Sequence, residues 1–470
     1  MRYLFLCLLP ITLCSGCGSD PETPAQAESA PIPLVLPSPA PAEKITTAEA
    51  TQTTQPESYS PTIRALLQRA RTAVTEGRHA GAIEALSQAI GFTPADARLF
   101  RMRADVYSLQ GENANARADF STAIRLAEND ADLYNARGYF LMTQGIPADA
   151  KADFDNAIER NPRHSAALNN RGLLLLAAGD LEESIKDFSL AIKAQADFME
   201  AWNNRSYARL KLSQLEEAMS DVRQAIRIRD DYPTAWNNCG LIAMEQQNYA
   251  EAARAFTRAI ELSPLEIRLL QHRREAYLKL EQFREAHADR DRIVWLQQLQ
   301  QLSESTGRSQ GNPNAWISRG EHLLQGREFG AAVQDFTRAV LLQPNNQQAL
   351  TLRAQAWLAM GDQEKAMLDC NQALSSGEFQ PALSLRGDLY LAADQAEQAV
   401  ADYNAAGRFD DSVAAAYDLL AESQLTTGDA AAAAASRQQA VAVRAALTRT
   451  LESRPNLPPA DDDGFDPLQN

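Results

Sequence analysis

The sequence predicts an all-α fold, an α-solenoid of about eleven helix–turn–helix units stacked along one axis. The first observation is a period of 34 residues that runs from residue 63 to residue 300 without a shift. The second is that small residues in each second helix recur in the same phase. A fixed period of this length is typical of stacked repeats, in which each unit buries its apolar face against the next. The recurring turn residues are Gly77, Gly111, Gly145, Gly179, Ser213, Gln247 and Glu281.

Residues 165–197 show one unit most clearly, with helices predicted over 166–178 and 181–194 around a turn at Gly179. The other units repeat an aromatic residue and a small residue in the first helix, an Ala-x3-Phe pair in the second, and a closing Pro. This pattern resembles the tetratricopeptide repeat family, which implies a protein-binding solenoid. The matching residues include Trp202, Trp236 and Trp316; Gly138, Gly172, Gly240, Gly320 and Gly387; Ala150 and Phe154; and Pro162 and Pro264.

The period also divides the chain. Residues 61–302 hold seven units, of which the seventh departs from the pattern because Arg274 replaces the small residue and Arg290 the aromatic one. A polar insert is predicted over 303–312, after a long second helix that ends near Ser303. Residues 313–453 hold four more units, closed by a longer capping helix over 430–449. Residues 454–470 are predicted to be a disordered acidic tail.

The beginning of the chain has the features of an export signal. Residues 1–16 combine Arg2 with a short apolar stretch, too short to span a bilayer as a helix. Residues 14–17, Cys-Ser-Gly-Cys, resemble the lipobox of bacterial lipoproteins, although Cys14 stands where Leu is usual. The resemblance implies lipidation of Cys17; the alternative is a plain signal peptide. Residues 17–60 are rich in Pro and Ala and are predicted to form a disordered tether.

The resemblance to lipoproteins also implies a location. Gly18 and Ser19 follow the modified Cys, where Asp would favour the inner membrane. We therefore expect a lipid-anchored protein of the bacterial cell envelope, attached to the outer membrane and facing the periplasm.

Two charged columns follow the period. An Arg precedes the small residue of most first helices, and an Asp stands sixteen residues later in the second helix. The sixth and last units lack both partners, with Cys239 and Ala255 in the sixth, so we predict Arg–Asp bridges inside each unit rather than between units. Two independent surface columns are the alternative. The predicted pairs are Arg103–Asp119, Arg137–Asp153, Arg171–Asp187, Arg205–Asp221, Arg273–Asp289, Arg319–Asp335, Arg353–Asp369 and Arg386–Asp402.

A row of Asn residues follows the first helices of units three to six, and we call it the Asn ladder. An amide donates and accepts hydrogen bonds, so such a row can bind an extended peptide backbone without regard to its sequence. It resembles the Asn ladder of O-linked N-acetylglucosamine transferase. The alternative is that these amides bond neighbouring turns of the protein itself. The ladder consists of Asn135, Asn169, Asn170, Asn203, Asn204, Asn237 and Asn238.

Arg98 and Arg101, with Arg64 and Arg71, form a candidate basic rim near the amino end of the same face. Arg binds carboxylates with two hydrogen bonds, so this rim would suit an acidic peptide. A solvated helix face is the alternative.

The rest of the sequence points away from catalysis. The five His residues lack ligand spacing, no phosphate-binding Gly loop is present, and the net charge of −16 argues against nonspecific nucleic-acid binding. We expect no enzyme activity, cofactor, metal or small-molecule substrate. The expected function is a scaffold or adaptor for an envelope protein or peptide. The alternatives are a self-associating structural protein, and hence a homo-oligomer, or an adaptor that regulates a periplasmic protease or peptidoglycan enzyme.

Overall fold

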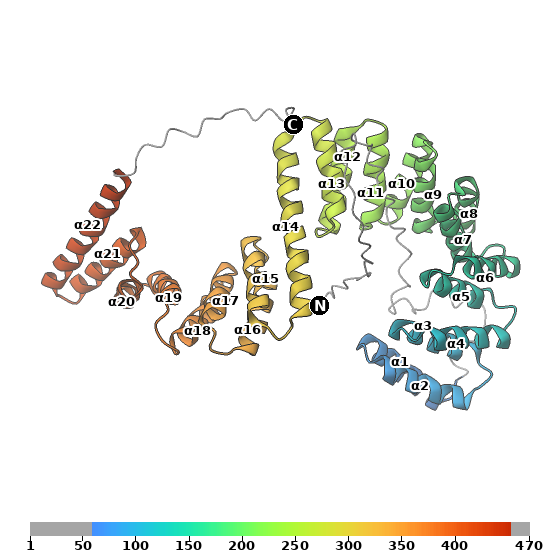
Figure 1. The fold of residues 1–470 in the computed structure, drawn as a ribbon, viewed down its shortest axis with the longest axis horizontal. Helices are drawn as coiled ribbons and strands as arrows, with labels where there is room; N and C mark the ends of the chain where they lie inside the picture. The colour runs from blue at the N-terminus through green and yellow to red at the C-terminus, as the bar shows by residue number, and fades with distance from the viewer. Residues whose placement is uncertain (1–58, 453–470) are drawn as a thin grey trace, which may run out of the picture. The chain divides into compact units, whose positions relative to one another are not determined.

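The computed structural model describes residues 59–452, with side chains to residue 449, and this part of the chain contains 22 α-helices and no strand. The predicted all-α solenoid fold is thereby confirmed. Odd-numbered helices are the first helices of the predicted units and even-numbered helices the second (Figure 1). The signal segment, the lipidation site Cys17, nearly all of the tether and the acidic tail lie outside the described residues.

The chain divides into two compact units between Asn248 and Tyr249. In each unit, a helix packs against its partner in the pair and against the first helix of the next pair. The helices of the first unit are α1 (Pro61–Thr75), α2 (His79–Phe92), α3 (Ala97–Gln110), α4 (Asn113–Leu126), α5 (Ala131–Thr143), α6 (Pro147–Arg160), α7 (Ser165–Ala178), α8 (Leu181–Ala194), α9 (Met199–Lys211), α10 (Leu215–Ile228) and α11 (Pro233–Glu245).

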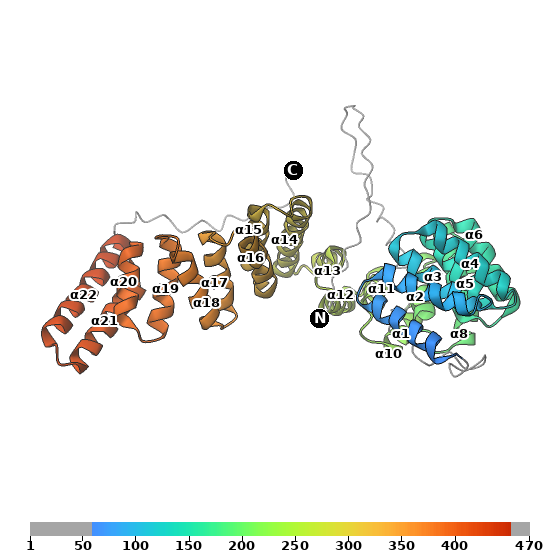
Figure 2. The same cartoon turned by 90° about the horizontal axis from the view of Figure 1, so that it is seen from below.

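The second unit continues the succession of helices, and Figure 2 shows its pairs following one another from α15 to α22. The predicted capping helix is present as α22. The helices are α12 (Tyr249–Leu262), α13 (Ile267–Lys279), α14 (Phe283–Arg308), α15 (Pro313–Gln325), α16 (Phe329–Leu342), α17 (Gln347–Ala359), α18 (Gln363–Leu374), α19 (Gln380–Ala392), α20 (Ala396–Ala406), α21 (Asp411–Thr426) and α22 (Ala430–Glu452).

The turn column has one backbone conformation, whatever residue occupies it. Gly179 has a φ of 88°, and Ser213, Gln247 and Glu281 have φ values of 58°, 59° and 58°. Left-handed backbone costs a residue with a Cβ roughly 1 kcal/mol, which Gly avoids. The later units therefore tolerate this strain because the packing of both helices fixes the turn.

The small column and the aromatic column meet inside each regular pair. A Cβ added at Gly172 would lie 2.7 Å from the ring of Phe188, which is completely buried. The same contact joins Gly320 to Phe336. The two columns therefore vary together, since a larger residue in the first needs the ring of the second to leave. This explains the seventh unit, where Arg274 stands in the first helix and Arg290 is exposed.

The insert predicted over 303–312 is a helix for more than half of its length. Helix α14 continues to Arg308, past the expected end near Ser303, so only residues 309–312 form the connection. The physical reason is burial on the far side of the segment. Thr306 is only 1% exposed, and its Oγ1 accepts a hydrogen bond of 3.2 Å from Arg319 of α15. A polar composition therefore concealed a helix end that packs against the next pair.

A Trp–His contact also fixes α14 against α15. The rings of Trp295 and His322 stack with centroids 4.9 Å apart. Trp295 Nε1 donates to the carbonyl of His322 at 3.3 Å, and His322 Nε2 lies 2.9 Å from the carbonyl of Trp295. This reciprocal contact replaces the usual packing of the seventh pair, so the succession of helices continues through the irregular unit.

Candidate functional site

The Arg and Asp columns lie face to face inside the pairs. Arg171 donates from Nε and Nη2 to the two carboxylate oxygens of Asp187, both at 2.7 Å. The Arg side chain is 23% exposed and the Asp side chain 6%. We call this two-bond contact the Arg–Asp clamp. It is present in all eight predicted pairs: Arg103–Asp119, Arg137–Asp153, Arg171–Asp187, Arg205–Asp221, Arg273–Asp289, Arg319–Asp335, Arg353–Asp369 and Arg386–Asp402.

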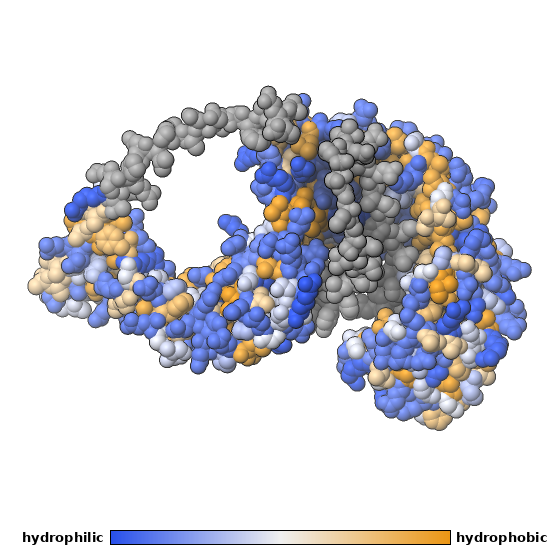
Figure 3. Space-filling view, viewed as in Figure 1, coloured by the Kyte–Doolittle hydropathy of each residue, from blue (hydrophilic) through white to orange (hydrophobic). Residues whose placement is uncertain are grey.

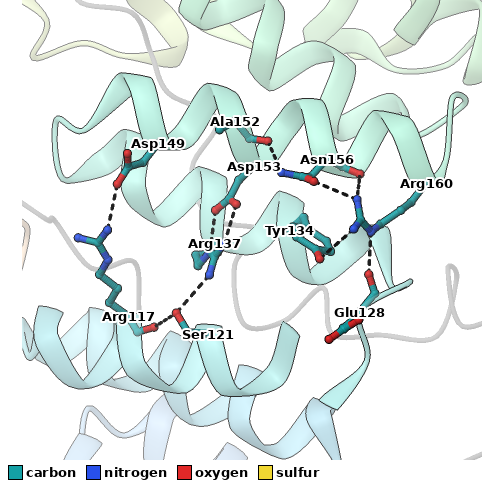
Figure 4. Close-up of polar contacts among 10 residues, drawn as sticks. All are labelled: Arg117, Ser121, Glu128, Tyr134, Arg137, Asp149, Ala152, Asp153, Asn156 and Arg160. Atoms are coloured by element: carbon teal, nitrogen blue, oxygen red, sulfur yellow. Dashed lines mark hydrogen bonds and ion pairs between the residues drawn. The ribbon is translucent and has the colours of Figure 1, made fainter. Parts of the chain in front are cut away.

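The remaining nitrogen of the same Arg reaches the preceding pair. Arg137 Nη1 donates to Ser121 Oγ of α4 at 3.2 Å while the other nitrogens hold Asp153 of α6 (Figure 4). One guanidinium of α5 therefore ties together three helices from two successive pairs. Equivalent acceptors stand sixteen residues before the Arg in most units: Ser87, Asp155, Ser189, Thr257 and Thr337.

This third bond was missed in the sequence, although its signal is there. The acceptor column contains Ser, Thr and Asp, and it has the period of the Arg column. The sixth unit departs at all three positions, with Arg223, Cys239 and Ala255. We therefore regard the three columns as one structural element, which we call the arginine junction.

The electrostatics of the junction keep its Arg charged. Hydrogen bonding to Asp187 raises the pKa of Arg171, partial burial lowers it, and a second carboxylate, Asp155, raises it further. Arg69 of the first pair is the exception, because Ala85 replaces its Asp. It instead meets Glu84 at 3.2 Å, with both side chains more than half exposed, and such a pair adds little to stability.

The Asn ladder forms three rungs between successive first helices. Asn170 Nδ2 donates to Asn135 Oδ1 at 3.0 Å, joining α7 to α5. Asn204 bonds Asn169 at 3.0 Å and Asn238 bonds Asn203 at 2.9 Å, which joins α9 to α7 and α11 to α9. The structure therefore brings six of the seven predicted Asn residues together in amide pairs. Asn237 lies in the same column and is 5% exposed.

Burial limits what the ladder offers to a ligand. Asn170 and Asn238 are 5% and 3% exposed, whereas Asn135 and Asn204 are half-buried. Asn169 is 1% exposed, and its Nδ2 is a buried donor without a hydrogen-bond partner in the described part of the chain. The ladder thus links neighbouring repeats, and it retains donors because an amide group carries two N–H bonds and each rung uses one.

The candidate basic rim has carboxylates within it. Arg98 is bonded to Asp96 at 3.0 Å and lies over the ring of Tyr59, 5.0 Å from its centre. Arg101 lies 4.0 Å from Asp105. The structure therefore places both predicted Arg residues on exposed surface, and each already has an acidic neighbour.

The second unit has an open depression of about 350 Å³ between α12 and α13 that the sequence did not indicate. Arg254, Arg258 and Gln282 form its polar wall, and Tyr277 and Leu280 its apolar side. Over the described residues, no group of His, Cys, Asp and Glu side chains could hold a metal ion, and no helix is long and apolar enough to cross a membrane.

Removing one partner of a clamp should cost more than removing both. Asp153→Ala leaves the Arg137 guanidinium without its carboxylate, which we expect to cost about 3 kcal/mol. The double variant R137C/D153A copies the residues of the sixth unit and should recover at least about 1 kcal/mol of that loss. Urea unfolding followed by circular dichroism measures both. A double variant no more stable than the single one would contradict a coupled pair.

The Asn column continues in α13 as His272, which makes stability depend on pH. Burial, with Arg268 nearby, lowers the pKa of His272 from 6.5 to about 4. The unfolded chain therefore binds a proton at higher pH than the folded chain does. The stabilisation is fully present above pH 6.5 and is lost as the pH falls towards 4.

We expect the wild-type chain to lose about 2 kcal/mol more than H272Q between pH 7 and pH 5, from the shift in proton affinity. Urea midpoints at the two pH values measure the difference. Equal losses in the two proteins would show that His272 has an ordinary pKa.

Comparisons with known proteins agree with this geometry. Tetratricopeptide repeat models match residues 67–134, 135–197, 200–232, 233–265 and 317–381. No curated protein matches the chain at a significant level. Among solved structures, PilW, a type IV pilus biogenesis factor, is 19% identical with a TM-score of 0.41, over 45% of this chain and 99% of that one.

Two other solved structures are similar in the same way. PilF of Pseudomonas aeruginosa is 16% identical with a TM-score of 0.39, over 42% of this chain and 90% of that one. YrrB, a repeat protein with an unusual peptide-binding site, is 20% identical with a TM-score of 0.34, over 40% of this chain and 98% of that one. The matched repeat models cover more than half of the sequence, and the chain belongs to the tetratricopeptide repeat family.

Proposed function

We propose that this protein is a membrane-anchored scaffold or adaptor that binds an envelope protein, through an extended segment, along the first helices of repeats three to six. A tetratricopeptide repeat chain is a protein-interaction scaffold, and the finer proposal rests on one observation. Three amide rungs, Asn135–Asn170, Asn169–Asn204 and Asn203–Asn238, follow one another at one rung per repeat. A regular row of amides suits a polypeptide backbone better than a compact ligand.

The surface outside the ladder supports a polar mode of binding. On the face shown in Figure 3, apolar residues are scattered among polar ones over both units. Large exposed apolar side chains, such as Phe92 and Leu190, stand on different helices. Strong association of soluble proteins through apolar contact needs a larger continuous patch. Backbone hydrogen bonding along the ladder is therefore the better-supported source of affinity.

The anchor is the second part of the proposal. Lipidation at Cys17, followed by the Pro-rich tether, would hold the repeats at the periplasmic side of the outer membrane. A single acyl chain binds membranes weakly and reversibly, so stable attachment needs more than one chain. The proposal therefore includes full lipoprotein processing at Cys17, for which the lipobox-like residues 14–17 are the support.

Partner capture tests the role of the ladder. The full-length tagged protein is crosslinked in envelope membranes, purified and compared with N170A/N204A/N238A. We expect the triple variant to capture at least about tenfold less partner, because each lost amide removes a hydrogen-bond donor. The matched control is N113A/N115A/N161A, which removes three exposed Asn residues away from the ladder.

Circular dichroism must show the same helix content for both triple variants. Undiminished capture by a folded N170A/N204A/N238A protein would remove the ladder from the proposal. Failure of both triple variants to capture partner would show that these substitutions act on the fold.

A further inference from the structure

The Asn ladder has donors in excess of acceptors. Each rung uses one N–H of an Asn that carries two, and the buried Nδ2 of Asn169 has no partner among the described residues. A buried unsatisfied donor costs about 1–3 kcal/mol. The chemistry that completes the ladder is therefore a row of hydrogen-bond acceptors that brings few donors of its own.

A Pro-rich backbone is such a ligand. Proline has a carbonyl but no N–H, and a polyproline II helix makes no internal hydrogen bonds, so its carbonyls are all available. Neighbouring first helices α5, α7, α9 and α11 pack against one another, and packed helices lie about 8–10 Å apart. Three residues of polyproline II advance about 9.3 Å and complete one turn. Each rung therefore meets the same side of the ligand.

An extended β-strand fits this ladder less well. Three residues of a strand cover a similar distance, about 10 Å, but successive side chains alternate between faces. Every second rung would then meet the opposite side of the strand. The period of the ladder thus distinguishes two conformations that an extended peptide can adopt, and it favours the polyproline form.

The chain itself contains a segment of this kind. Residues 31–41, with the sequence Pro-Ile-Pro-Leu-Val-Leu-Pro-Ser-Pro-Ala-Pro, are about 34 Å long as polyproline II. The four first helices of the ladder span three intervals, or about 24–30 Å. The segment is therefore long enough to cover every rung once.

The described part of the chain also starts close to the ladder. Tyr59 Oη donates to Asp96 Oδ2 at 2.5 Å and the Tyr59 ring lies under Arg98, so the chain enters the fold at repeat two. The ladder begins at Asn135 in repeat three. The residues between 41 and 59 span up to about 60 Å when extended.

From these observations we infer that the ladder binds polyproline II segments, and that residues 31–41 of the same chain occupy it until a partner displaces them. This rests on the proposed function and adds the ligand's conformation and its first occupant. Asn204 is the central residue of the site, since it is half-buried, forms the middle rung and has an N–H to spare.

The test uses the full chain and a fluorescein-labelled synthetic peptide of residues 29–43. A variant with Ser at positions 31, 33, 37, 39 and 41 removes the internal competitor and leaves the described residues unchanged. Fluorescence anisotropy should show at least tenfold tighter binding of the peptide to this variant than to the wild-type chain. A peptide with the same five Pro→Ser changes should not bind. Equal affinity for the two chains, or binding of the Ser peptide, would overturn the inference.

Adding N204A to the Pro→Ser chain should weaken peptide binding about tenfold, whereas N115A, on the exposed side of α4, should not change it. If N204A does not fold, the side-chain amide resonance of Asn204 is compared between the wild-type and Pro→Ser chains. An unchanged resonance overturns the inference. A mass that doubles with concentration only in the wild-type chain would place the segment on a second copy and overturn its occupancy in the same chain.

The two proposals fail separately. Partner capture that depends on Asn204, together with no binding of the peptide, removes only the polyproline inference. Peptide binding without partner capture removes only the scaffold assignment.

Discussion

The arginine junction is the interaction on which the rest of the structure depends. A tetratricopeptide pair is too small to bury its own apolar surface, so its stability comes from its neighbours. Apolar packing supplies the energy but specifies the register weakly. The guanidinium has five donors in a fixed plane, and Arg171 uses them on Asp187 of its own pair and Asp155 of the preceding one. One side chain thereby fixes the position of three helices.

The junction also sets the geometry of the candidate binding surface. First helices held in one register place one Asn rung per repeat, and it is this regularity that allows a row of amides to follow an extended backbone. The same rungs bond one helix to the next, as Asn204 does with Asn169. Structure and recognition therefore share these side chains, and the binding capacity is what remains after the rungs have formed. The accessible members, Asn135 and Asn204, have the most capacity left.

Much of this architecture could be predicted from the sequence, because repetition turns weak signals into strong ones. A single Arg sixteen residues before an Asp means little, but eight such pairs in phase, lost together in the sixth unit, indicate contact. The acceptor column of Ser121 and its equivalents could have been found in the same way. The end of α14 could not, since Thr306 reads as a polar loop residue and only the position of α15 makes it a buried one.

The limits at the candidate site have a similar cause. Amide columns predict that Asn side chains lie together, but whether they bond each other or a ligand depends on distances between helices. Nothing in the sequence around Arg98 and Arg101 separated a free basic rim from one with acidic neighbours, since Asp96 and Asp105 reach them through side-chain rotamers. Contacts within a period were therefore predictable, and the use of the remaining hydrogen bonds was not.

The most direct test of the arginine junction is native-state hydrogen exchange of Arg137→Lys. Lysine keeps the charge beside Asp153 but lacks the planar fork that also reaches Ser121 of α4. If the junction couples successive pairs, amide exchange should become faster in α4 as well as in α5 and α6. Faster exchange confined to α5 and α6 would show that the third bond does not connect one pair to the next.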